Sequence, residues 1–208
     1  MKTENLTYTI CMKNKLIIII FSSFLILTVV LFLVFNFVLY PKKYSDYVNF
    51  YSKEYGVDSA LVYAVIKAES DFDKNAKSKS GAIGLMQIIP RTGKWIAQEL
   101  GENFDENNLF KPETNVRYGC FYLNYLFCKF DDTNAVICAY NAGEGVVRGW
   151  LDDEGNLDES KITYSETKNY LKRVNGFFKA YKNSKICFWV KLILTKLLVN
   201  LYNSFIKL

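Results

Sequence analysis

The sequence contains no histidine among its 208 residues. This absence excludes Ser-His-Asp and Cys-His nucleophilic sites, and it removes the commonest ligands of catalytic zinc. The five cysteines are an odd number, and their spacing matches no metal-binding pattern. Cys120 and Cys128 are expected about 12 Å apart on one helix, too far for a disulfide. Together with Cys138 they fit small hydrophobic core residues, so we expect neither a metal nor a cofactor.

The sequence also lacks a basic stripe of the kind that binds nucleic acid. Its formal net charge is +5, but residues 44–182 hold 17 basic against 20 acidic side chains. The excess positive charge therefore lies beside the apolar ends of the chain, where anionic lipid headgroups would attract it. Nucleic acid is not an expected partner, whereas a membrane is.

A long uncharged run, LIIIIFSSFLILTVVLFLVFNFVL, covers residues 16–39. As a helix it would measure about 36 Å, enough to cross a hydrocarbon core of about 30 Å. A cleaved signal peptide is the alternative, but its apolar stretch would be about 7–15 residues and would end at a small-residue cleavage site. We expect an uncleaved single-pass transmembrane anchor over 16–40, with residues 1–15 in the cytoplasm and the following domain outside it. Lysines flank both ends, so charge alone barely decides the orientation.

No run alternates between apolar and polar residues with period two, and helical periodicity predominates instead. The sequence therefore predicts one all-α, mainly helical domain over residues 44–183, with an acidic surface loop at 150–160. The expected helices cover residues 45–56, 58–70, 90–101, 112–130, 134–140 and 166–182. Asp58 and the pair Asp131-Asp132 fit N-caps, and a Thr163-x-x-Glu166 capping box is expected to open the last helix.

The tail, residues 184–208, is apolar and basic. On a helix, Lys196, Asn200, Asn203 and Lys207 would form one polar stripe, which favours a membrane-interface helix over 186–208. Packing against the domain's own surface is the alternative. A second full span is disfavoured because lysines interrupt the apolar run.

Glu69 follows the apolar face of the helix expected at 58–70, three or four residues after Val65 and Ile66. Loss of hydration on that face would raise the pKa of its carboxyl, as would the nearby helix C-terminus. A carboxyl that keeps its proton near neutral pH can donate it to a leaving-group oxygen. The alternative is an ordinary surface glutamate paired with Lys or Arg.

The residues after Glu69 form a motif, ESDFDKNAKSKSGAIGLMQIIP, in which Gly81 and Gly84 permit tight turns. The amide of Gln87 could bind a sugar's acetamido or hydroxyl groups. This motif resembles the signature of the soluble-lytic-transglycosylase family, the goose-lysozyme-like murein-cleaving enzymes. Three further blocks resemble that family in the same order: ETNVRYGCFYLNYL, AVICAYNAGEGVV and ETKNYLKRV. The resemblance covers about residues 47–178, and it departs at Ile89, where many relatives carry Met.

The resemblance implies a lysozyme-like domain in which Glu69 is the catalytic acid/base. The positions it implies for substrate binding are Ser78, Met86, Gln87, Tyr140, Asn141, Glu166 and Tyr170. Core packing is an equal alternative for Met86. A buried, hydrogen-bonded tyrosine is an alternative for Tyr140, and a helix stop is one for Asn141.

Ordinary glycoside hydrolases use two carboxylates, but the acids nearest in sequence, Asp71 and Asp73, are poorly placed to assist Glu69. The resemblance implies that one glutamate suffices to cleave the β-1,4 bond between N-acetylmuramic acid and N-acetylglucosamine in peptidoglycan glycan strands. An intramolecular hydroxyl then gives 1,6-anhydro ends. A water-using muramidase and a non-catalytic wall-binding or structural envelope protein are the alternatives. Protein partners are not indicated by the sequence.

Overall fold

The computed structural model describes residues 17, 19–32, 40–183 and 196. The chain divides into two compact units, Met1–Pro41 and Lys42–Leu208. In the first unit, residues 19–32 are helical and their large apolar side chains are mostly exposed. None of the helices in the described ranges is both long and apolar enough to cross a bilayer. Residues 16, 18 and 33–39 of the expected anchor lie outside those ranges, as does the expected interfacial tail apart from Lys196.

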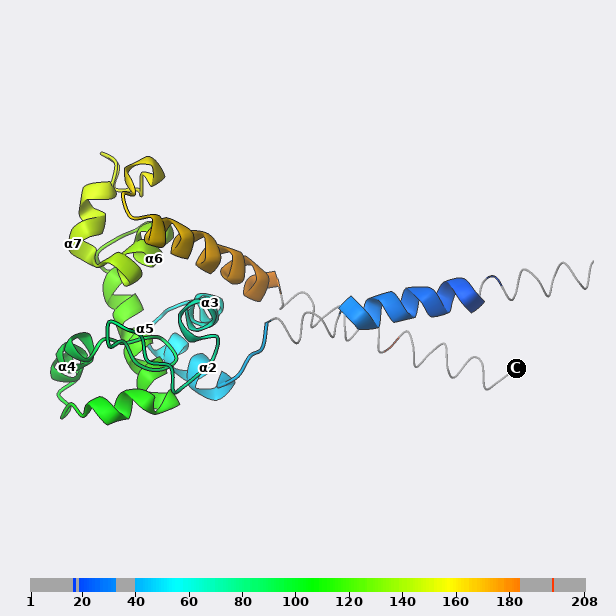
Figure 1. The fold of residues 1–208 in the computed structure, drawn as a ribbon, viewed down its shortest axis with the longest axis horizontal. Coiled ribbons are helices and arrows are strands. Elements are labelled where there is room, and N and C mark those ends of the chain that lie inside the picture. Colours follow the sequence, from blue (N-terminus) through cyan, green and yellow to red (C-terminus); the bar gives the residue numbers. More distant parts are fainter. Residues whose placement is uncertain (1–16, 18, 33–39, 184–195, 197–208) are drawn as a thin grey trace, which may run out of the picture. The chain divides into compact units, whose positions relative to one another are not determined.

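The second unit is helical, as the sequence predicts (Figure 1). Its α-helices are α2 (Ser45–Glu54), α3 (Ser59–Ser70), α4 (Pro90–Glu99), α5 (Pro112–Phe127), α6 (Thr133–Ala142) and α7 (Glu144–Val147), followed by a long helix over residues 165–183. Short 3-10 helices occur at η1 (Glu106–Phe110), η2 (Arg148–Trp150) and η3 (Glu159–Lys161). Within the described residues, β-pairing is limited to isolated bridges.

The helix starts follow the capping residues of the sequence. The carboxylate of Asp58 accepts a hydrogen bond from the Ala60 amide at 2.8 Å, and that of Asp132 accepts one from Asn134 at 2.9 Å. Pro90 and Pro112 occupy first-turn positions, where no amide hydrogen is needed. These local signals therefore predicted four helix starts correctly.

Two local predictions are wrong. The last helix begins at residue 165, one residue before the expected start, but among the described residues no hydrogen bond joins Thr163 to Glu166 as the expected capping box requires. Helix α5 ends at Phe127 instead of near residue 130, which leaves Cys128 exposed rather than in the core. Cys120 and Cys138 are buried, as expected, and all three thiols are free.

Helix α3 lies at the centre of the second unit and is buried from Ala60 to Ile66 (Figure 1). Such burial on every side is typical of a core helix rather than an amphipathic surface helix. Helix α2 packs against both α3 and α5, and the helix of residues 165–183 lies beside α3. Tyr181 of that helix stacks on Tyr63 of α3 with 5.2 Å between ring centroids. The C-terminal turn of α3 is partly exposed, as is Ser59 at its start, and Glu69 lies in that C-terminal turn.

Asn115 of α5 holds the loop that follows α3. Its side chain is completely buried and makes three hydrogen bonds. It accepts from the Met86 amide at 2.7 Å and donates to the carbonyls of Ile83 and Leu109, each at 2.8 Å. Gly84 has φ +79°, and a Cβ there would collide with Asn115 and the Leu109 carbonyl. The glycine is therefore required both by its backbone conformation and by the closeness of α5.

Candidate active site

Glu69 is a partly buried carboxyl at the end of α3. Its Oε1 accepts a hydrogen bond from the hydroxyl of Tyr170 at 2.7 Å. Burial raises the pKa of Glu69 to about 7, and the charge of Glu166 adds to this rise. The Tyr170 hydrogen bond and the charge of Arg173 act in the opposite direction but do not overcome burial. Among the described residues no ion pair joins Glu69 to a Lys or Arg, so the surface-glutamate alternative does not fit.

The neighbouring carboxylates have different surroundings. Asp71 follows the end of α3 with φ 51°, is largely exposed and forms an ion pair with Lys67. Glu166 is exposed at the start of the helix over residues 165–183. The site therefore has one carboxyl whose pKa lies near neutral pH. In the described part of the chain, no second carboxylate is hydrogen-bonded to it. Such a group can both donate and accept a proton.

Two tyrosines predicted for the site lie close to Glu69. Tyr170 is almost completely buried, and Tyr140 is partly buried on α6. The Tyr140 hydroxyl donates to the Met86 carbonyl at 2.8 Å, so it is hydrogen-bonded as the alternative interpretation proposed. Burial raises the pKa of both phenols, and the negative charge of Glu69 adds to this rise. The structure thus brings together Glu69, Tyr170, Tyr140 and the backbone of Met86.

Met86 and Gln87 stabilise the loop after α3. The Met86 side chain is completely buried and lies so close to Gly119 that a Cβ on this glycine would collide with its sulfur. The Gln87 amide nitrogen donates to the carbonyls of Gly84 at 2.9 Å and Ala76 at 3.2 Å. Core packing therefore describes Met86, and the Gln87 amide nitrogen is occupied within its own loop.

The other predicted positions have local roles in the structure. The Ser78 hydroxyl accepts from the Ala82 amide at 2.9 Å, closing the turn that contains Gly81. The Asn141 side chain accepts from the Thr167 hydroxyl at 2.8 Å, which ties the end of α6 to the helix of residues 165–183. Among the described residues, no hydrogen bond joins Ser78 or Asn141 to Glu69, whereas the charge of Glu166 raises the pKa of Glu69.

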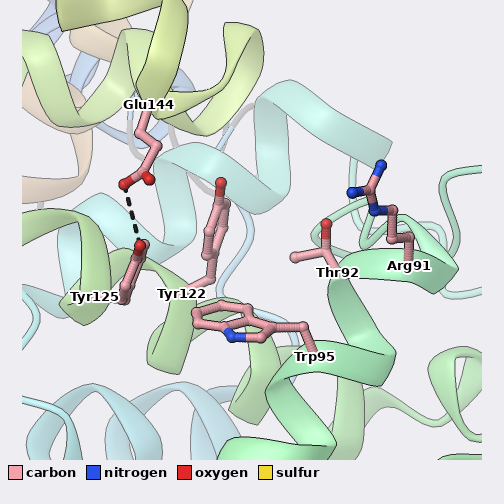
Figure 2. A pocket seen from close by; sticks show the side chains of 6 residues that line it. All are labelled: Arg91, Thr92, Trp95, Tyr122, Tyr125 and Glu144. Atoms are coloured by element: carbon pink, nitrogen blue, oxygen red, sulfur yellow. Dashed lines mark hydrogen bonds between the residues drawn. The ribbon is translucent and has the colours of Figure 1, made fainter.

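A pocket of about 230 Å³ lies near this site (Figure 2). It is lined by Arg91, Thr92 and Trp95 of α4, Tyr122 and Tyr125 of α5, and Glu144 of α7. The Tyr122 ring packs against Tyr140 with 5.4 Å between centroids, which connects the pocket to the surroundings of Glu69. This pocket was not predicted from the sequence. The spacing of Tyr122 and Tyr125, which places both on one face of a helix, was the available signal.

A helical fold with one carboxyl at the end of its central helix is the arrangement expected of a lysozyme-like domain. The sequence profile named Transglycosylase SLT domain matches residues 46–163. The chain therefore belongs to the transglycosylase SLT domain family.

Named relatives agree with this membership. The soluble lytic murein transglycosylase of Salmonella typhimurium is 32% identical over 69% of this chain and 24% of its own. The membrane-bound lytic murein transglycosylase C of Glaesserella parasuis is 33% identical over 68% of this chain and 46% of its own. A solved structure of an inactive mutant of lytic transglycosylase Slt from Pseudomonas aeruginosa superposes with a TM-score of 0.65, at 30% identity, over 71% of this chain and 25% of that one. The chain thus spans between a quarter and a half of these relatives, and the lysozyme-like fold is confirmed.

The hydrogen bond from Tyr170 provides a test of the site's electrostatics. A Tyr170→Phe substitution removes a donor that stabilises the ionised carboxylate, so the pKa of Glu69 should rise by roughly one unit from about 7. A titration followed by the ¹³C shift of the Glu69 carboxyl would measure this change. Tyr140→Phe is the matched control, because that hydroxyl bonds the Met86 carbonyl instead. Equal shifts in both variants, or a fall after Tyr170→Phe, would contradict the assignment.

Proposed function

We propose that this protein is a membrane-anchored peptidoglycan lytic transglycosylase, which cleaves the β-1,4 bond between N-acetylmuramic acid and N-acetylglucosamine. Membership of the SLT family and the names of the relatives support this activity. A further solved structure, of the 70-kDa soluble lytic transglycosylase with bulgecin A, is 29% identical with a TM-score of 0.63 over 70% of this chain and 25% of that one. The observation that carries the proposal is the Glu69 carboxyl, whose pKa is raised to about 7.

In the proposed reaction the protonated Glu69 gives its proton to the glycosidic oxygen as the bond from C1 to that oxygen breaks. The resulting carboxylate then accepts the proton of the C6 hydroxyl on the muramoyl ring, and that oxygen bonds to C1. The products are a 1,6-anhydromuramoyl end and a free hydroxyl on the departing sugar, and Glu69 regains its proton. No water is consumed, and the proximity of the intramolecular hydroxyl replaces a second carboxylate.

The proposed roles of the other positions follow from their contacts. Tyr170 positions the Glu69 carboxyl, and Glu166 contributes a charge at the site. The remaining proposed substrate-binding positions are Ser78, Met86, Gln87, Tyr140 and Asn141. Because Met86 is buried and the hydroxyl of Tyr140 is hydrogen-bonded, we propose that these two shape the glycan groove through packing and backbone placement.

We also propose the membrane arrangement expected from the sequence. Residues 1–15 would lie in the cytoplasm, 16–40 would cross the membrane, and the catalytic domain of residues 44–183 would lie outside the cytoplasm. The uncharged run at 16–39 supports this arrangement, as does the similarity to relatives named membrane-bound. The tail at 186–208 would contact the membrane interface. Protease protection in membrane vesicles of known orientation would test which side carries the domain.

Product analysis tests the chemistry. The full chain in detergent is incubated with purified murein, and the soluble fragments are weighed by mass spectrometry. Anhydromuramoyl ends, lighter than reducing ends by one water, are the expected result. Reducing ends would identify a muramidase instead, and binding without cleavage would identify a wall-binding protein.

A further inference from the structure

Helix α2 exposes two aromatic side chains on its outer side. Phe50 is 63% exposed and Tyr47 is 37% exposed, whereas Val48 and Tyr51 on the opposite side of the helix are buried. Tyr47 and Phe50 are three residues apart, so they are neighbours on the helix surface. Because large aromatic residues are usually buried, the outer side of α2 is a candidate contact surface.

This surface lies close in sequence to the expected membrane exit. The uncharged run ends at residue 39, and α2 begins at Ser45. The chain between these two positions can span at most about 22 Å, even when it is fully extended. If the run crosses the bilayer as proposed, the first turn of α2 is therefore held within that distance of the hydrocarbon core.

The last helix of the second unit ends in the same region. Tyr181, near its end, stacks on Tyr63 of α3 with 5.2 Å between ring centroids. Burial raises the pKa of Tyr63 to about 12, and the charge of Asp46 adds to this rise, so the first turn of α2 lies near the same tyrosine. The two apolar segments of the sequence, 16–39 and 184–208, therefore continue from one region of the second unit.

We propose that the outer side of α2 lies against the interfacial region of a phospholipid bilayer, with the rings of Tyr47 and Phe50 at the level of the headgroups. Aromatic side chains are enriched at such interfaces, although tyrosine and tryptophan more than phenylalanine. The exposed charges on α2 are Asp46, Lys53 and Glu54, so the aromatic rings rather than a basic stripe favour the bilayer. This inference rests on the membrane arrangement of the proposed function.

Such a contact is compatible with an open catalytic site. At the start of α3, Asp58 forms an ion pair with Lys182 of the last helix at 3.6 Å. Near the end of α3, Glu69 accepts the hydrogen bond from Tyr170 of the same last helix. The Cα atoms of Asp58 and Glu69 are about 17 Å apart along the helix axis. Glu69 is therefore separated from the region of chain entry by most of the length of α3.

The test uses the full chain in vesicles of phosphatidylcholine and phosphatidylglycerol. The parent protein carries Trp189→Phe, because Trp189 belongs to the tail. To this parent is added either Phe50→Trp or the matched control Tyr164→Trp. Tyr164 is 51% exposed and directly precedes the helix of residues 165–183, so it lies at the opposite end of that helix from Tyr181.

Lipids that carry bromine near the headgroup end of their acyl chains quench a tryptophan that contacts them. They should quench the emission added by Phe50→Trp at least about twofold more than that added by Tyr164→Trp, because the apolar side of an interfacial helix lies about 5–10 Å inside the headgroup boundary. Equal lipid quenching of the two variants would overturn the inference.

Iodide, a quencher dissolved in water, distinguishes the ways in which the inference can fail. Quenching of the Phe50→Trp protein by iodide alone would show that α2 faces water. Protection from both quenchers would show that a protein surface covers α2, either the tail or a second copy of the chain. Both results would overturn the bilayer contact.

Flotation of the same vesicles separates this inference from the proposed function. A protein that does not float with the vesicles would contradict the proposed anchor, and the contact would fail with it. A protein that floats, but whose Phe50→Trp variant is quenched no more than the control, would contradict the contact alone.

Discussion

The substitution Glu69→Gln is expected to lower the rate of murein cleavage by about 10³-fold, within the range that general acid–base groups contribute. Glutamine has nearly the same size as glutamate, and its amide oxygen can still accept the 2.7 Å hydrogen bond from Tyr170. It cannot donate a proton to the glycosidic oxygen or accept one from the C6 hydroxyl. The measurement is the release of soluble fragments from purified murein by the full chain.

Asp71→Asn is the matched control, because Asp71 is exposed and its ion-pair partner is Lys67. Its cleavage rate should stay within about twofold of the unsubstituted protein, since an exposed ion pair contributes little. Thermal unfolding of the Glu69→Gln variant should show an intact fold, with a midpoint no lower than that of the unsubstituted protein. Full activity in Glu69→Gln would end the single-acid mechanism. An equal loss in Asp71→Asn would indicate a two-carboxylate mechanism instead.

The helices were predictable because their start signals are local. Asp58 and Asp132 cap through amides two residues away, and Pro90 and Pro112 need no partner in the first turn. Helix ends were less predictable. Residues 128–130 continue the helical composition of α5, yet the helix stops at Phe127. Helix ends depend on the tertiary packing of the next segment as well as on local propensity.

The raised pKa of Glu69 was also predictable, because it follows from the apolar face on which this residue lies. The hydrogen-bond donor to the Glu69 carboxyl was not predictable from the residues alone. Tyr170 lies 101 positions further along the chain, and no local rule selects it among 15 tyrosines. The resemblance pointed to Tyr170 as a substrate-binding position, whereas the structure shows its hydroxyl bonded to the acid.

The motif residues have physical explanations that the sequence did not reveal. In the block NVRYG, Asn115 bonds three backbone groups around the loop after α3, and Gly119 leaves room for Met86. The Gln87 side chain closes the GLMQ turn by donating a hydrogen bond to the Gly84 carbonyl. Many of the residues that carry the resemblance therefore stabilise the loop beside Glu69. Trp95 and Tyr122 were missed because an exposed aromatic face in a pocket has no sequence signature distinct from that of a core aromatic.

The substitution Asn115→Leu is expected to reduce the free energy of unfolding by about 3–9 kcal/mol. Leucine has a similar size, but it leaves the Met86 amide and the Ile83 and Leu109 carbonyls without their partner. Each buried, unpaired backbone group costs about 1–3 kcal/mol, and an entire domain is stable by only about 5–15 kcal/mol. Denaturant unfolding followed by circular dichroism would measure the loss.

Asn124→Leu is the matched control for this loss of stability. Asn124 lies on the same helix, α5, but its side-chain amide makes a single hydrogen bond, to the Tyr55 carbonyl at 2.9 Å, and is only partly buried. The Asn124→Leu substitution should therefore reduce the free energy of unfolding by only about 1 kcal/mol. If Asn115→Leu proved no more destabilising than Asn124→Leu, the loop beside Glu69 would have to be held by its own turn contacts. These are the Gln87–Gly84 and Ser78–Ala82 hydrogen bonds, and α5 would then serve only as packing.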